Sequence, residues 1–177
     1  MVGVNVSSGA TLASGVSGSI ATADQSSVAV SGNLAPGDLG SAGTLTLALG
    51  RGGALNFNTG STLNFDLGPT SSASDLVSFS SAGNWLTGSG NVTLALNGIG
   101  TGIDYGQTYT IFQNVSTSSF TFANITGYDT ADYQASVTQS ENDYQLSFAA
   151  VVPEPSSLVS LCGAFGLLGV LRRRKRG

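Results

Sequence analysis

Alternating apolar and polar residues dominate the chain from residue 44 onward. Residues 44–49 (TLTLAL) alternate strictly, and residues 55–58 (LNFN) and 63–66 (LNFD) repeat one pattern at a spacing of eight. Each segment places Leu or Phe on one face and Asn, Asp or Thr on the other, as a β-strand with one buried face does. Gly-containing segments at 59–61 and 68–70 predict turns between these strands.

A second repetition is longer. Residues 46–49 (TLAL) recur at 93–96, 47 residues later, and residues 75–79 (DLVSF) predict another strand between them. Leucine-rich strands separated by turns indicate a solenoid, in which each coil buries its apolar face on the next coil. We therefore predict an all-β, solenoid-like body over residues 44–150, with chance recurrence of short alternating segments as the alternative interpretation.

The alternating segments after residue 98 are more aromatic and β-branched. They comprise residues 109–112 (YTIF), 120–122 (FTF), 133–137 (YQASV) and 144–148 (YQLSF). Strands favour such residues, and the short spacing between these segments also fits an antiparallel sheet, so a β-sandwich is the alternative fold. A more antiparallel C-terminal part would cap the solenoid and cover its strand edges.

Residues 1–43 form a lead-in rich in Gly, Ser, Ala and Thr. Residues 27–31 (SVAVS) alternate like a half-buried strand, and residues 36–40 carry turn signals. The small polar composition leaves disorder of residues 1–22 open. The first residues lack the basic and apolar regions of a signal peptide, so we expect the true N-terminus to lie upstream.

Residues 151–177 have three parts in order: a Pro-rich motif, an apolar run at 158–171 and a basic cluster. Proline is excluded from helix interiors, so the motif predicts an extended segment before a helix. The uncharged run is short against the roughly 20 residues that a bilayer needs, but thinning and snorkelling would close the gap. The cations that follow would stay on the cytoplasmic side, which places the body outside. A helix buried in the protein core is the alternative interpretation of the apolar run at 158–171.

The predicted transmembrane helix contains Leu158, Leu161, Phe165, Leu167, Leu168 and Leu171, and the basic stop signal comprises Arg172, Arg173, Arg174, Lys175 and Arg176.

This tail resembles the PEP-CTERM sorting domain, which stands at the C-terminus of exported proteins of Gram-negative bacteria. The resemblance covers about one seventh of the chain. It implies that Val152, Pro153, Glu154 and Pro155 form a sorting motif recognised by an exosortase, a membrane cysteine protease of the transpeptidase type. It also implies transient insertion in the inner membrane, removal of the tail near the motif, and release or attachment at the surface alongside exopolysaccharide.

The body resembles a second family. Residues 44–67 and 106–112 are similar to the autotransporter-associated β-strand repeat of passenger regions. That resemblance implies a right-handed parallel β-helix.

The composition of the chain argues against several classes of function. Residues 1–153 carry nine acids and one base, whereas residues 154–177 carry one acid and five bases, so an acidic body disfavours nucleic-acid binding. The chain has no His, which removes His-based catalysis and His metal sites. Nothing in the sequence brings two carboxylates together for glycoside hydrolysis, and we expect the aspartates near turns to form Asx-turns. These turn aspartates are Asp104, Asp129, Asp132 and Asp143.

We therefore predict no catalytic residues, no metal site and no cofactor. The sequence predicts a non-enzymatic, exported structural or adhesive protein of the cell surface or extracellular matrix. The alternative is a secreted carbohydrate-binding or carbohydrate-active module. Trp85, the single Trp, is expected to make hydrophobic packing contacts, with stacking on a sugar as the alternative.

Overall fold

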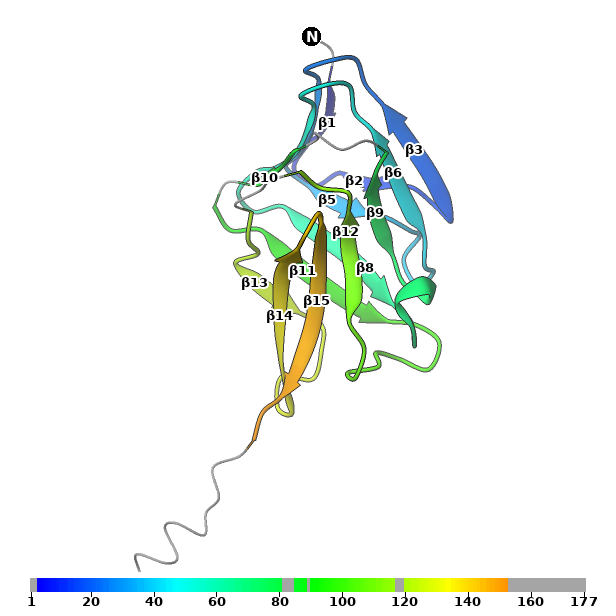
Figure 1. Ribbon diagram of the computed structural model, residues 1–177, viewed down its shortest axis with the longest axis vertical. Helices are drawn as coiled ribbons and strands as arrows, with labels where there is room; N and C mark the ends of the chain where they lie inside the picture. Colours follow the sequence, from blue (N-terminus) through cyan, green and yellow to red (C-terminus); the bar gives the residue numbers. More distant parts are fainter. Residues whose placement is uncertain (1–2, 81–84, 89, 117–119, 153–177) are drawn as a thin grey trace, which may run out of the picture.

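The computed structural model describes residues 3–80, 85–88, 90–116 and 120–152 (Figure 1). These residues contain fifteen strands, one 3-10 helix and no α-helix. The strands are β1 (Val4–Val6), β2 (Thr11–Ala13), β3 (Ser17–Ala21), β4 (Ser27–Val30), β5 (Asn33–Ala35), β6 (Thr44–Ala48), β7 (Ala54–Phe57), β8 (Thr62–Leu67), β9 (Leu76–Phe79), β10 (Trp85–Gly88), β11 (Thr93–Gly98), β12 (Tyr109–Gln113), β13 (Asn124–Thr126), β14 (Tyr133–Ser140) and β15 (Asp143–Ala150), and the 3-10 helix is η1 (Ser71–Ala73).

The strands form three sheets. Sheet A has the order β1-β4-β7-β10, sheet B the order β13-β11-β8-β5-β2, and sheet C the order β14-β15-β12-β9-β6-β3. The chain visits A, B and C in turn, and each of four coils (β1–β3, β4–β6, β7–β9, β10–β12) contributes one strand to each sheet. Corresponding strands of successive coils that pair do so in parallel. The predicted all-β solenoid is therefore confirmed, and the coils are not an antiparallel sandwich.

The alternating pattern builds the core as stacked apolar rows. In sheet B, Leu34, Leu63 and Leu94 occupy paired positions and are fully buried. In sheet A, Val28 and Leu55 are stacked in the same way. Burial of one such side chain stabilises the fold by about 1.5–3 kcal/mol. The polar residues between them point outward, so the outer faces of the sheets consist mainly of Thr, Ser, Asn and Ala.

Coil length varies along the solenoid. In sheet B, Leu12 pairs with Leu34, Leu34 with Leu63, and Leu63 with Leu94, which are steps of 22, 29 and 31 residues. The eight-residue repetition joins β7 to β8, which are successive sides of one coil. The 47-residue repetition joins β6 in sheet C to β11 in sheet B, so it is not a coil repeat.

The predicted lead-in, residues 1–43, supplies strands β1 to β5 from its described residues. These strands extend the three sheets: β1 pairs with β4, β2 with β5, and β3 with β6, all in parallel. The inward side chains of the first coil include Val6, which is buried, and Val4, Leu12 and Ile20, which are only partly buried. The first coil therefore joins the core as its least covered layer.

The C-terminal part is antiparallel. β15 pairs antiparallel with β12 and with β14, and this hairpin lies at the end of the molecule opposite the N-terminus (Figure 1). Residues 120–122, predicted as a strand, are not part of one, although Phe120 and Phe122 both face the core and Thr121 between them is exposed. Phe120 stacks on Phe57 with ring centroids 5.5 Å apart, and Phe122 stacks on Phe112 at 6.4 Å.

Within the described ranges, no helix has the length and apolar character needed to cross a membrane. The predicted transmembrane helix at 158–171 lies outside them.

Candidate functional site

The predicted sorting motif starts where the cap ends. β15 ends at Ala150, the backbone N–H of Val151 donates to the carbonyl of Asp132 at 2.8 Å, and Val152 is 82% exposed. The other predicted tail residues lie outside the described part of the chain, and they are Pro153, Glu154, Pro155, the helix residues from Leu158 to Leu171 and the basic residues from Arg172 to Arg176. The first motif residue is therefore at the surface, directly after the hydrogen-bonded hairpin.

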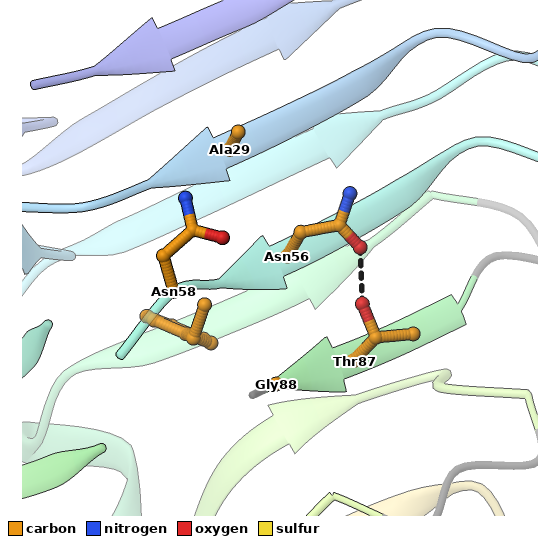
Figure 2. A pocket seen from close by; sticks show the side chains of 6 residues that line it. Ala29, Asn56, Asn58, Thr87 and Gly88 are labelled. Carbon is orange, nitrogen blue, oxygen red and sulfur yellow. Dashed lines mark hydrogen bonds between the residues drawn. The ribbon is translucent and has the colours of Figure 1, made fainter. Parts of the chain in front are cut away.

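The outer face of sheet A carries an uncharged polar row that crosses four coils. The strand register places Asn5, Ala29, Asn56 and Thr87 side by side on β1, β4, β7 and β10. Neighbouring strands are about 4.8 Å apart, so the row follows the solenoid axis. The Thr87 hydroxyl donates a hydrogen bond to Oδ1 of Asn56, which orients the amide (Figure 2).

A hollow of about 320 Å³ lies on this face. Its lining includes Asn56 and Thr87, together with Asn58, whose Nδ2 donates to the Ser31 hydroxyl at 2.8 Å. Figure 2 shows the Asn56 amide nitrogen pointing away from Thr87. The hollow therefore presents oriented amide and hydroxyl groups. Its lining residues are all uncharged: Ala29, Asn56, Phe57, Asn58, Thr87 and Gly88.

Trp85 lies beside this hollow on β10. Leu86 is 1% exposed and faces the core, so the alternation along the strand directs Trp85 and Thr87 to the outer face. The indole is 56% exposed. Trp85, for which the sequence predicted hydrophobic packing, therefore presents more than half of its surface to solvent.

Gly88 allows the core to close under the same strand. A Cβ at Gly88 would lie 2.5 Å from ring atoms of Phe120, so any larger residue would displace that ring. Phe120 in turn stacks on Phe57, the buried residue below the hollow. The aromatic core therefore supports the floor of the hollow from inside.

A different group of polar residues, the acid pair Asp66 and Asp75, is buried. Asp66 is 4% exposed, and its carboxylate accepts hydrogen bonds from the backbone N–H groups of Gly40 at 2.6 Å and Ser41 at 2.9 Å. Its other oxygen accepts from the Asn97 side-chain amide at 2.7 Å. Asp66 therefore fixes the middle of the loop at residues 36–43, which leads from β5 to β6.

Asp75 fixes the end of that loop before β6. It is 2% exposed, and its oxygens accept from the backbone N–H groups of Gly43 at 2.7 Å and Asp66 at 2.8 Å. Burial raises the pKa of Asp75 to about 6, against the two backbone hydrogen bonds, and the Asp66 charge raises it further. The space between Asp38, Asp66 and Asp75 measures only about 10 Å³. It has room for about one water molecule at most, so the pair is positioned to hold the loop and not to bind a substrate.

Two of the turn aspartates form the expected Asx-turns. Asp104 accepts from the N–H of Gly106 at 2.9 Å, and Asp129 accepts from that of Ala131 at 3.0 Å. Asp143 instead accepts from the N–H of Asn114 at 3.0 Å and joins two strands of the cap. Across the residues that the structure describes, no group of three or more His, Cys, Asp or Glu side chains is arranged to hold a metal ion.

Comparisons with protein-family models, with curated proteins and with solved structures found no match for this chain.

The sequence indicated the tail but missed the sheet A face. One signal was present: in residues 85–88 (WLTG), Trp85 shares its alternation with Thr87, whereas Leu86 occupies the opposite face. A polar partner two residues away indicates an outward face. The importance of Asn56 could not be inferred, because its stacking against Thr87 depends on a coil length that the sequence did not reveal.

Proposed function

We propose that this chain is a non-enzymatic, exported β-helical protein of the cell surface or extracellular matrix, sorted through residues 151–177. One observation carries the proposal: a Pro-rich motif, an apolar run and a basic cluster follow in that order directly after the last strand. The exposure of Val152 supports it, because a protease needs access to the backbone of the motif.

In this proposal the tail acts before the body. The apolar run 158–171 inserts in the inner membrane of a Gram-negative-type bacterium, and the basic cluster 172–176 holds the C-terminus in the cytoplasm. An exosortase then recognises Pro153, Glu154 and Pro155 and removes the tail, which leaves the body at the surface or in the matrix with exopolysaccharide. We also propose right-handed winding for the coils, as the autotransporter-type resemblance implies and as parallel crossovers favour.

Intact-mass measurement of the mature protein tests the sorting step. In cells that contain the exosortase, we expect a mass that lacks the residues beyond about Pro155, and in cells without the enzyme we expect the tail to be retained. A full-length mass in both cells would make the tail a permanent anchor and overturn the sorting proposal.

Substitutions in the motif provide the matched control. Changing Pro153 and Pro155 together to Ala is expected to prevent processing while the apolar run stays intact. Changing Pro69, which lies in an exposed turn of the body, to Ala is expected to leave processing unchanged. Equal processing of both variants would show that cleavage does not depend on the motif.

Carbohydrate binding is a second candidate function, and one observation favours it. Trp85 exposes 56% of its surface beside a row of oriented amide and hydroxyl groups. Such binding is compatible with a matrix protein and does not require catalysis.

A further inference from the structure

We propose that the outer face of sheet A, around Trp85, Thr87 and Asn56, binds a neutral glycan chain. This inference deepens the proposed function, on which it rests, because it names the matrix component that the exported body contacts.

The chemistry of the face matches a sugar. A pyranose ring has an apolar C–H surface, which stacks on an aromatic ring, and a rim of hydroxyl groups, which both donate and accept hydrogen bonds. Trp85 supplies an exposed ring with an apolar body. Asn56, Asn58 and Thr87 supply amide and hydroxyl groups within one hollow, in the mixture of apolar and convergent polar groups that ligand sites use.

The polar groups are oriented before any ligand binds. The Thr87 hydroxyl donates to Oδ1 of Asn56, and Nδ2 of Asn58 donates to Ser31. Among the described residues, no hydrogen bond uses Nδ2 of Asn56, so its two donor hydrogens are available to a ligand hydroxyl. Preorganised groups lose less conformational entropy on binding than free side chains do.

The absence of charge selects the class of glycan. The hollow is lined only by uncharged residues, and the row from Asn5 to Thr87 adds no charge along the solenoid axis. An anionic glycan would find no cation here to compensate the loss of its hydration. The row also has the shape for a chain rather than a single sugar, because its positions repeat about every 4.8 Å across four strands.

A second hollow among the described residues is less suited to a sugar. It measures about 350 Å³ and lies beside η1 on sheet C, where Ser71, Ser72 and Thr110 line it with Leu76. It contains hydroxyl groups but no aromatic ring, so it lacks the stacking surface that distinguishes the sheet A face.

Affinity electrophoresis tests the proposal on the purified full chain. The native gel would contain hydroxyethylcellulose, dextran or galactomannan as neutral probes, or polygalacturonate as the anionic probe. A polyoxyethylene detergent, which carries no sugar, keeps the tail soluble. We expect retardation by at least one neutral probe and none by polygalacturonate. No retardation by any neutral probe, or stronger retardation by polygalacturonate, would overturn the proposal.

Variants locate the binding surface. Trp85→Ala is expected to weaken binding at least tenfold and Asn56→Ala severalfold, whereas Trp85→Phe keeps part of the affinity. Thr93→Ala is the matched control, because Thr93 points outward from β11 on sheet B. Unchanged binding by Trp85→Ala, or an equal loss in Thr93→Ala, would contradict the assignment.

Fluorescence gives an independent readout, because Trp85 is the only Trp in the chain. Titration with cellohexaose, or with an oligomer of whichever neutral probe retards the chain, is expected to change the emission of Trp85 saturably.

Sedimentation velocity tests whether a second copy of the chain covers this face instead of a glycan. If Trp85 packs against a second copy, Trp85→Ala will lower the oligomeric state, and the glycan proposal fails. Binding is measured on purified protein and processing in cells, so failure of one does not imply failure of the other.

Discussion

The C-terminal end of the solenoid packs aromatic rings under an antiparallel hairpin, whereas most of the inward aliphatic side chains of the first coil are only partly covered. At the C-terminal end Phe112 is fully buried, with ring centroids 5.9 Å from Tyr144 and 6.3 Å from Phe57. In the first coil, Leu12 and Ile20 face inward from sheets B and C and are only partly buried. Both ends use the same three-sheet framework.

This difference shows that the contribution of a side chain in a solenoid depends on its layer. An inward residue is fully buried only when a coil or a cap lies on both sides, as it does for Leu63 between Leu34 and Leu94. Stability should therefore be greatest in the middle coils and at the aromatic cap and lowest in the first coil, because interactions between neighbouring layers dominate.

The largest effect is expected at the cap. Phe112→Ala removes a buried ring that contacts Phe57, Phe120, Phe122 and Tyr144. We expect the free energy of unfolding to fall by about 3–5 kcal/mol, measured by urea denaturation. Phe112→Leu should cost less, because much of the apolar volume remains. A loss below about 1 kcal/mol in Phe112→Ala would show that the cap does not stabilise the solenoid.

The free energy of unfolding is expected to depend on pH through Asp75, which holds the loop at 36–43. The pKa of Asp75 is raised from 3.8 to about 6, mainly by burial. Between these values the folded state binds more protons than the unfolded state, so stability falls as pH rises from about 4 to about 6. The full contribution is about 3 kcal/mol. Comparing the free energy of unfolding at pH 4 and pH 7 in wild type and in Asp75→Asn isolates this term, and an identical pH dependence in both would contradict it.

Hydrogen exchange shows which part of the chain loses stability when Asp75 ionises. The loop at 36–43 contacts the first coil, because the Ser14 hydroxyl donates to the carbonyl of Pro36 and the N–H of Thr44 donates to the carbonyl of Val16 at 3.1 Å. Raising the pH from 5 to 7 should therefore lower the protection factors, which are corrected for the intrinsic pH dependence of exchange, in residues 14–22 and 36–43. The hairpin at 133–150 is the internal control, and its protection factors should not change. An equal fall there would mean that ionisation weakens the whole fold.

The strands could be predicted from the sequence because the side chains of a strand point to the same face at every second residue. The segments around Leu47, Leu63 and Leu146 alternate, and each lies in a strand with its apolar face buried. The pairing of strands could not be predicted, because loops such as 36–43 lengthen individual coils. The 47-residue repetition, for example, relates β6 to β11 in sequence, although these strands lie in different sheets and β11 pairs with β8.

Some site residues could likewise be predicted from the sequence, whereas others depend on how the coils stack. The proposed sorting motif at Pro153–Pro155 is defined by residue order, so it can be predicted from the sequence alone, and it lies outside the described residues. The sheet A face depends on stacking, which brings Asn56 next to Thr87 although they are 31 residues apart. Phe120 and Phe122 were misassigned as a strand because an alternating aromatic pair can also fold over a core end, and only tertiary packing decides between the two.

The smallest effect is expected in the first coil. Leu12 and Leu63 lie in the same row of sheet B, but Leu12 is partly buried and Leu63 fully buried. Leu12→Ala should lower the free energy of unfolding by about 1 kcal/mol, against about 2–5 kcal/mol for the matched Leu63→Ala. Urea denaturation of both variants measures the ratio directly. Equal losses would mean that the first coil is packed as tightly as the third, and the contrast between the two ends would then lie in the chemistry of the side chains and not in their burial.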